Sequence, residues 1–309
     1  MNPPAASTAI LADIRRLTLH DGPGTRDTVF LKGCPLRCLW CHNPESISAV
    51  PQLLYRSRLC TGCGDCARIC TAGVHLLPEG GEHTLNTALC RSCWRCAENC
   101  LGGALTWCGK TVTPEEVFSE VMQEQEFFIQ SEGGVTLSGG EPLLYPLFAG
   151  ALFRMLRQHG IHTALDTCGQ VPAAAFEAVL PWTSMILYDL KGMDEENHRR
   201  NTGCGNREIL ANLARLGKGG VPVEIRMPII PEHNDAPEEI AAAGKFLSAL
   251  PAVTAIRLLP YHSLARNKYA FCGRHDTMPR VAPPSPEHLQ ELADILLHAS
   301  GKPVLLPDG

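Results

Sequence analysis

Short apolar runs recur along the chain and predict the strands of a sheet. Each run has four to seven residues and is flanked by polar or glycine-containing segments. The predicted strands are Thr28–Lys32, Val135–Ser138, Thr163–Thr167, Met185–Leu190, Val223–Ile229 and Ala255–Pro260.

Segments with helical start and stop signals lie between these runs. Thr113 is a typical N-cap, and the proline and two glutamates that follow it predict a helix to about Ser131. The other predicted helices are Pro146–His159, Pro172–Val179, Arg207–Leu216, Pro237–Ala249 and Pro286–Ala299. Strands that alternate with helices predict an α/β fold with βαβ crossovers and a parallel sheet. Six such units are too few for an eight-stranded barrel and fit a partly open (β/α)6 barrel.

The spacing of the predicted strands is uneven in one place. The first two strands are about a hundred residues apart, whereas later neighbours lie about twenty to forty apart. We therefore predict that residues 49–103 form a small inserted domain, and that residues 1–48 and 104–309 form the barrel.

Composition adds an unusual cysteine content to this picture. Of the 309 residues, 15 are cysteine, 45% are hydrophobic and 19% are charged, with a net charge of −5. The charge balance argues against binding to nucleic acid or to an anionic membrane through bulk electrostatics. The N-terminus lacks a signal-peptide pattern, and no apolar stretch approaches the ~18 residues of a membrane helix. We expect a reducing cytoplasm, where clustered thiols favour metal binding over disulfides.

Two cysteine runs share the spacing C-x2-C-x2-C-x3-C and lie thirty residues apart. Bacterial ferredoxins use this run to bind two [4Fe–4S] clusters, and the fourth cysteine of each run ligates the other cluster. That rule predicts one cluster on Cys60, Cys63, Cys66 and Cys100, and another on Cys90, Cys93, Cys96 and Cys70. Structural zinc is the alternative, although its ligand pairs are usually separated by longer gaps.

A third group, Cys34, Cys38 and Cys41, offers only three thiolates. A [4Fe–4S] cluster held by three cysteines leaves one iron open to an exogenous ligand, as a catalytic zinc site keeps an open position. A fourth ligand from elsewhere in the chain, such as Cys108 or Cys168, is the alternative that spacing leaves open.

The C-terminal ends of the predicted strands carry polar groups and glycines, where a parallel β/α barrel places its chemistry. The three-cysteine loop follows the first strand, and Ser138-Gly139-Gly140-Glu141-Pro142 ends the second. The later strands carry Asp166-Thr167, Asp189-Leu190-Lys191, Arg226 and Pro260-Tyr261-His262 at or near their ends.

Together these motifs resemble those of radical S-adenosylmethionine (SAM) enzymes. More narrowly, the chain resembles the glycyl-radical-enzyme activating enzymes with a twin-cluster insert, which act on dehydratases, decarboxylases and lyases. The narrower resemblance is carried by His20–Gly24, Phe30–Pro35, Trp40–Glu45 and Leu259–His262, and it covers roughly residues 14 to 298. Related sequences usually read GPGIRT where this chain has Gly24-Thr25-Arg26-Asp27, which predicts an added charge beside a loop that faces the partner.

The resemblance implies roles around the methionyl end of SAM. The open iron of the cluster on Cys34, Cys38 and Cys41 would bind its amino and carboxylate groups. Gly139 and Gly140 would let the backbone approach, because they lack a Cβ. Glu141 would take up the ammonium, and Lys191 and Arg226 would be the cations near the carboxylate. Asp189 and Leu190 belong to the same implied SAM site, and Lys191 is also expected among the catalytic residues.

The resemblance further implies that Trp40 and His42 flank the adenine and that His262 closes the pocket. Asp166, Thr167 and Asp189 are candidates to hold a monovalent cation or polar groups of SAM. We expect the four remaining cysteines (Cys108, Cys168, Cys204 and Cys272) to be buried or incidental thiols. His75 and His83 belong to no pattern, and we expect them to be solvated.

The implied cofactors are three [4Fe–4S] clusters and SAM. Reductive cleavage of SAM would yield methionine and a 5′-deoxyadenosyl radical that removes a Cα hydrogen from a glycine of a glycyl radical enzyme. The resemblance also implies a ferredoxin or flavodoxin as reductant, electron relay through the insert, a monomer and an anaerobic cytoplasm. A radical SAM enzyme that modifies another peptide or protein, and an electron-transfer iron–sulfur protein, are the alternatives.

Overall fold

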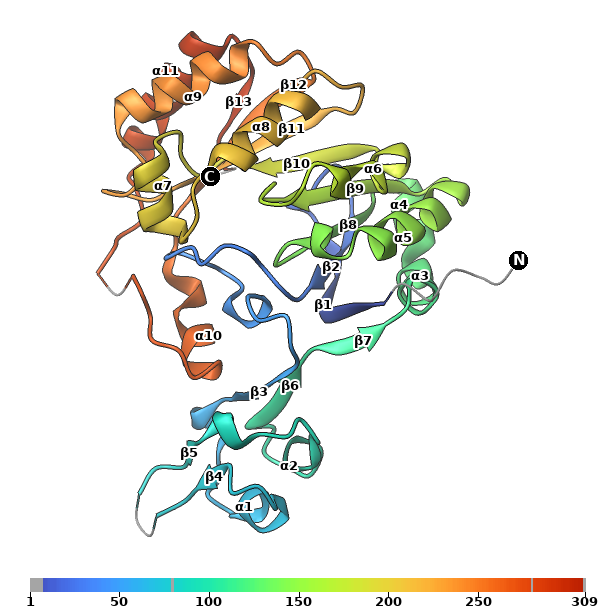
Figure 1. Cartoon of the computed structure of the whole chain (residues 1–309), viewed down its shortest axis with the longest axis vertical. Helices are drawn as coiled ribbons and strands as arrows, with labels where there is room; N and C mark the ends of the chain where they lie inside the picture. The colour runs from blue at the N-terminus through green and yellow to red at the C-terminus, as the bar shows by residue number, and fades with distance from the viewer. Residues whose placement is uncertain (1–7, 79–80, 279, 308–309) are drawn as a thin grey trace.

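The computed structural model describes residues 8–78, 81–278 and 280–307 and is built around a nine-stranded sheet (Figure 1). All six predicted strands form, and they pair in parallel in the order of the chain. They are β2 (Arg26–Leu31), β8 (Gly134–Gly139), β9 (His162–Thr167), β10 (Met185–Asp189), β11 (Val223–Ile229) and β12 (Val253–Pro260). This element order confirms the predicted α/β fold.

Three further strands extend the sheet at its edges. β1 (Ala9–Thr18) pairs antiparallel with β2, and β7 (Lys110–Val112) pairs antiparallel with β1. β13 (Val304–Leu305) joins the opposite edge in parallel with β12. The apolar pattern did not predict β1, because charged residues interrupt this strand after Ala12 and most of its side chains are partly exposed. The sheet is therefore mixed, although mainly parallel.

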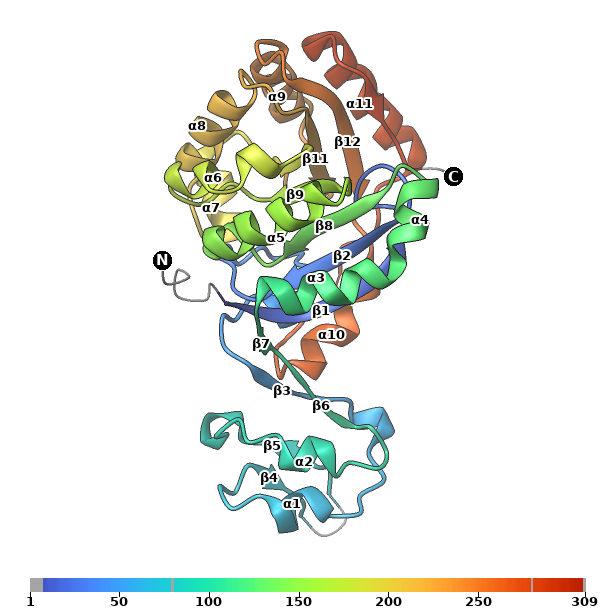
Figure 2. The same cartoon turned by 90° about the vertical axis from the view of Figure 1, so that its right-hand side faces the viewer.

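Helices cover the outer face of the sheet, and large apolar side chains such as Leu152, Phe153 and Phe176 are completely buried there (Figures 1 and 2). The helices outside the inserted segment are α3 (Pro114–Val121), α4 (Gln125–Gln130), α5 (Pro146–Gln158), α6 (Ala174–Glu177), α7 (Glu195–Thr202), α8 (Arg207–Leu216), α9 (Pro237–Ser248), α10 (Arg266–Phe271) and α11 (Pro286–Ser300). Sequence patterns did not predict α7 and α10. In the described part of the chain, no helix combines the length and the apolar character needed to cross a membrane.

The helix predicted from Thr113 begins as expected and is interrupted in the middle. Thr113 Oγ1 accepts a hydrogen bond from the Glu116 amide at 3.2 Å, and Glu116 Oε2 accepts one from the Thr113 amide at 2.9 Å. This reciprocal capping box satisfies two amides at the start of α3. A 3₁₀ turn at Met122–Glu124 then separates α3 from α4.

A small lobe lies away from the sheet on a two-stranded antiparallel ribbon, visible at the bottom of Figure 2. The ribbon consists of β3 (Gln52–Tyr55) and β6 (Leu105–Cys108), and Gln52 is paired with Cys108 at its base. The Lys32 side chain is completely buried at this base, and its Nζ lies 3.4 Å from Gln52 Oε1 and 3.9 Å from Cys108 Sγ.

The lobe repeats its backbone as well as its sequence. Each cysteine run follows a 3₁₀ turn, at Ser57–Leu59 and Thr87–Leu89, and contains a short helix, α1 (Asp65–Ile69) or α2 (Arg95–Glu98). The corresponding elements begin thirty residues apart. Between them, β4 (His75–Leu76) and β5 (Thr84–Leu85) pair antiparallel.

Candidate active site and cysteine groups

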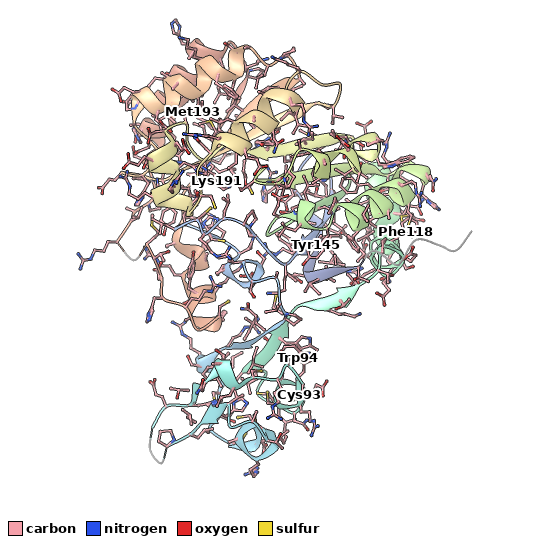
Figure 3. All side chains as sticks on the ribbon, viewed as in Figure 1. Cys93, Trp94, Phe118, Tyr145, Lys191 and Met193 are labelled. Atoms are coloured by element: carbon pink, nitrogen blue, oxygen red, sulfur yellow. The ribbon has the colours of Figure 1, made fainter. Side chains whose placement is uncertain are left out.

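A cavity of about 700 Å³ lies where the parallel strands end, and most of the predicted site residues line it. Figure 3 labels one of them, Lys191, which lies just beyond the end of β10 at Asp189. The predicted residues in the cavity wall are Cys34, Cys38, Cys41, Trp40, His42, Gly139, Gly140, Asp166, Asp189, Lys191, Arg226 and His262. Glu141, Thr167 and Leu190 are absent from this lining. Side chains from distant parts of the sequence therefore share one cavity.

The three-cysteine loop is fixed by backbone hydrogen bonds to α7. The amides of Arg37 and Leu39 donate to the carbonyls of Thr202 and Asn201 at 2.7 and 2.9 Å. Burial, together with the neighbouring thiols of the loop, raises the pKa of Cys38 and raises that of Cys41 to about 11. A bound cation reverses this effect, because a coordinating thiol is deprotonated. The donor set and its burial therefore fit an iron–sulfur cluster.

Cys168 is buried, as one of the two predicted alternatives has it, and it lies beside the three-cysteine loop. It lines the same cavity, and a hydrogen bond between the two thiols lowers the pKa of Cys34 and raises that of Cys168. Cys108 lies instead on β6, beside Lys32, and is not part of the cavity lining. Of the two thiols that spacing left open as a fourth ligand, only Cys168 is in this cavity.

Two cations on the cavity wall are paired with carboxylates. Lys191 Nζ lies 2.5 Å from Asp189 Oδ2, and this neighbour raises the pKa of Lys191 although burial alone lowers it. Arg226 lies 3.5 Å from Asp21 and 3.9 Å from Asp166. Burial raises the pKa of Asp166 to about 7, against the opposing effect of Arg226. Asp21 was missed as a site residue, although it belongs to the His20–Gly24 motif.

Glu141 does not face the cavity, which corrects its expected role as partner of the SAM ammonium. Its Oε1 accepts a hydrogen bond from the Leu143 amide at 3.0 Å, and its Oε2 accepts one from the Cys168 amide at 2.9 Å. Thr167 Oγ1 lies 2.9 Å from both oxygens. The carboxylate is completely buried and joins the loop after β8 to the end of β9.

At the expected cation site, the Thr167 hydroxyl donates to Glu141, and the carboxylates of Asp166 and Asp189 lie near Arg226 and Lys191. Cation binding there stays a prediction. The Leu190 side chain belongs to the hydrophobic core, so it does not contact a molecule in the cavity.

His42 and His262 stack on each other, with ring centroids 4.2 Å apart and an interplanar angle of 17°. His42 Nε2 lies 3.2 Å from the His262 carbonyl, and burial lowers the pKa of His42 to about 4. Trp40 packs with Ile230 and Tyr261 in a small buried cluster next to them. These residues form one continuous aromatic wall of the cavity.

In the lobe, the last cysteine of each run lies with the first three cysteines of the other run. A separate cavity of about 100 Å³ is lined by Cys60, Cys63, Cys66 and Cys100, so the last cysteine of the second run joins the first three of the first run. Burial and the nearby thiols of Cys70, Cys90 and Cys93 raise the pKa of Cys96 to about 11. Figure 3 labels Cys93 and Trp94 in this lobe.

His75 and His83 are buried in the lobe, contrary to the expectation that they are solvated. His75 Nδ1 lies 3.1 Å from His83 Nε2, and His83 Nδ1 lies 3.6 Å from Cys60 Sγ. Burial lowers the pKa of both histidines, to about 4 for His75, so both rings are neutral near pH 7. Their pattern was hidden because the seven residues between them contain no regular repeat.

The extra charge at Arg26 and Asp27 is also inside the protein, which corrects its expected place beside a partner-facing loop. Both residues are completely buried on β2, between β1 and β8. Arg26 Nε donates to Thr136 Oγ1 at 2.8 Å, and Asp27 Oδ1 accepts from the Leu17 amide at 3.0 Å.

Comparison with known proteins finds similar proteins over most of the chain. Residues 28–243 match the family described as the Radical SAM superfamily. The isethionate sulfite-lyase activating enzyme of Oleidesulfovibrio alaskensis is 40% identical over 281 residues, covering 89% of this chain and 90% of that protein. The choline trimethylamine-lyase activating enzyme of the same species is 37% identical, covering 86% and 87% of the two chains. The benzylsuccinate synthase activating enzyme of Thauera aromatica is 36% identical, covering 86% and 82%.

Solved structures show the same fold at much lower sequence identity. A radical SAM methyltransferase from Sphaerobacter thermophilus aligns with a TM-score of 0.55 at 15% identity, covering 99% of this chain and 78% of that one. The sequence match and the similarity to activating enzymes over most of both chains lead to one conclusion. The chain belongs to the radical SAM superfamily and, within it, to the family of glycyl radical enzyme activating enzymes.

Proposed function

We propose that this chain cleaves SAM in the cavity at the strand ends and so generates a glycyl radical on a partner enzyme. The observation that carries the proposal is the convergence of Cys34, Cys38 and Cys41 on one cavity with two buried cations, Lys191 and Arg226. When bound, the cluster on these cysteines supplies the electron that splits SAM into methionine and the 5′-deoxyadenosyl radical, which takes a Cα hydrogen from the partner's glycine.

The residues around the cavity bind and orient SAM. Lys191 and Arg226 provide positive charge for a carboxylate, and Asp189 and Asp166 keep these cations ionised although they are buried. The aromatic wall formed by Trp40, His42 and His262 offers flat surfaces to an adenine and excludes water. We assign a positioning role to Glu141, because its carboxylate holds the glycine loop against β9.

Gly139 and Gly140 are required by the loop itself as well as by close approach of a ligand. A Cβ on Gly139 would lie 2.4 Å from the Leu31 backbone, and one on Gly140 would lie 2.0 Å from the Gly33 carbonyl oxygen. Gly139 also has a backbone φ of +111°, which residues with a side chain rarely adopt. Both glycines let this loop lie directly on the end of β2.

We also propose that residues 49–103 form a ferredoxin-like domain inserted into a partial (β/α)6 barrel, and that it holds two more [4Fe–4S] clusters. The two groups of four cysteines support this, because each brings the last cysteine of one run to three from the other. The clusters would relay electrons from a ferredoxin or flavodoxin, as the chemistry needs a low-potential donor. Oxygen destroys such radicals, so the proposed setting is an anaerobic cytoplasm.

For the partner, we propose a glycyl radical enzyme of the lyase type. The isethionate sulfite-lyase and choline trimethylamine-lyase activating enzymes named above support this choice. An isethionate sulfite-lyase is therefore the first partner to test.

The test is anaerobic reconstitution of the full chain. We expect roughly twelve iron atoms per chain, four for each of three clusters, and 5′-deoxyadenosine once a reductant and SAM are added. A glycine-centred EPR signal should then appear on the sulfite-lyase. Cys38→Ala should abolish both products, whereas Cys204→Ser, outside the cavity lining, should retain them. Absence of 5′-deoxyadenosine from the fully loaded protein would refute the proposed reaction.

A further inference from the structure

His83 connects a buried histidine pair to one ligand group of the lobe. Its Nδ1 lies 3.6 Å from Cys60 Sγ, and its Nε2 lies 3.1 Å from His75 Nδ1 and 3.9 Å from Cys66 Sγ. Tyr55 packs against the His83 ring with centroids 4.6 Å apart. The imidazole also lines the cavity formed by Cys60, Cys63, Cys66 and Cys100, so it is fixed beside these sulfurs.

The hydrogen-bond partners indicate which nitrogen carries the proton. A neutral imidazole has one N–H donor and one acceptor nitrogen. A thiolate sulfur can only accept, and Cys60 Sγ, 3.6 Å from His83 Nδ1, is nearer than Cys66 Sγ, 3.9 Å from His83 Nε2. His83 Nε2 has a closer partner in His75 Nδ1, at 3.1 Å. We therefore assign the proton of His83 to Nδ1, which donates to Cys60, and let Nε2 accept from His75 Nδ1–H. His75 Nε2 is then a bare acceptor, and it is buried without a hydrogen-bond partner in the described residues. The chain of donors therefore points toward the sulfur.

We propose that His83 is a positioning residue that donates this hydrogen bond to Cys60 and raises the reduction potential of the cluster on Cys60, Cys63, Cys66 and Cys100 above that of its sister. This inference rests on the proposed function, because it requires clusters in the lobe. Reduction adds negative charge to a cluster and its sulfurs, so a donor to a sulfur stabilises the reduced form more than the oxidised form. His75 holds the His83 ring in the donating tautomer, as second-shell partners do for metal-site histidines.

The sister group lacks such a donor in the described part of the lobe. Among the side-chain hydrogen bonds of the described residues, none joins a histidine to Cys70, Cys90, Cys93 or Cys96, whereas His83 lies beside Cys60 and Cys66. The two groups otherwise share one apolar cluster, which includes Leu53, Val74 and Leu105. The repeat of thirty residues thus gives two similar ligand groups. The histidine pair between the runs makes them unequal in the hydrogen bonds that their sulfurs accept. Electrons entering the lobe would collect on the cluster beside His83.

The test compares the reduction potentials of the lobe clusters in the fully reconstituted chain, followed by EPR during a redox titration. His83→Leu removes the donor and should lower the potential of one cluster by about 59 mV, which is a tenfold lower ratio of reduced to oxidised cluster at a given potential. His83→Gln keeps an N–H donor and should restore part of the difference. His75→Leu removes only the supporting residue and should give a smaller decrease. Thr84→Ala, at an exposed neighbouring position, is the matched control.

Iron content separates failure of this inference from failure of the proposed function. If the unmodified chain holds only about four iron atoms, one cluster's worth, the proposed lobe clusters are wrong and the inference falls with them. If all variants hold the full iron content and their potentials agree with that of the unmodified chain, the lobe clusters stand and the role of His83 is refuted. Loss of iron from both His83 variants would also refute it, because His83 would then be needed to retain the cluster.

Discussion

Replacement of Glu141 by glutamine distinguishes a positioning carboxylate from one that binds SAM. In the structure, both carboxylate oxygens accept hydrogen bonds from the protein, from the amides of Leu143 and Cys168 and from the Thr167 hydroxyl. A glutamine has one carbonyl oxygen in place of two acceptors. Whichever way it is oriented, its NH₂ group faces either the Leu143 or the Cys168 amide, and one buried donor loses its partner.

The size of the effect follows from these contacts. A hydrogen bond to a charged acceptor contributes about 1.5–3 kcal/mol, and an unsatisfied buried donor costs about 1–3 kcal/mol. Burial offsets part of this loss, because it raises the pKa of Glu141 and so penalises the ionised carboxylate. We therefore expect Glu141→Gln to lower the free energy of unfolding by about 2–4 kcal/mol. SAM affinity should change little in the fraction that remains folded.

Anaerobic urea unfolding followed by circular dichroism measures the stability, and equilibrium dialysis measures SAM binding. Thr167→Val is the matched variant, since it removes a donor to Glu141 without touching the cavity lining. The double variant should be less destabilised than the sum of the single variants, by about 1 kcal/mol, because the two residues share one interaction. Unchanged stability together with a tenfold or larger loss of SAM affinity would refute the reasoning and restore the ammonium-binding role.

Three further changes test other parts of the structure. Burial raises the pKa of Asp27 to about 6, so the folded protein resists ionisation of this residue and loses stability as the pH rises from about 4 to 6. In pH-dependent unfolding, Asp27→Asn should therefore be about 1–3 kcal/mol more stable than the parent above pH 6, with no difference below about pH 4. Gly140→Ala places a Cβ 2.0 Å from the Gly33 carbonyl oxygen and should abolish SAM binding in dialysis, whereas Gly220→Ala, which meets no atom within 4 Å, should not. Thr113→Ala removes the capping box and should cost about 1 kcal/mol in thermal unfolding.

The central strands were predictable because their apolar runs coincide with complete burial. β8 and β10 appear within one residue of their predicted bounds, and Arg207–Leu216 forms α8 as predicted. Edge strands lack that signal. β1 begins with a short apolar stretch, Ala9–Ala12, but continues through the exposed and charged Asp13, Arg15 and Arg16, and only pairing with β2 shows it to be one strand.

The candidate site was predictable from residue types, such as closely spaced cysteines, that have few roles other than metal binding. The spacing of cysteines and the glycines after β8 located the cavity. The role of Glu141 was not predictable, because a carboxylate next to two glycines suits either a ligand or the backbone amides of another loop. The same holds for His83, whose partners His75 and Cys60 are near it only after the two cysteine runs fold together.

The paired base of the β3–β6 ribbon makes the lobe an exchangeable module. Gln52 and Cys108 face each other across the ribbon, so the chain enters the lobe and leaves it at nearly the same point. A tight turn could join these two positions without moving β1, β2 or β7, because the entropy of closing a loop depends only weakly on its length. In evolutionary terms, a lineage could gain or lose the whole lobe in one insertion or deletion while the main sheet and its cavity stay intact.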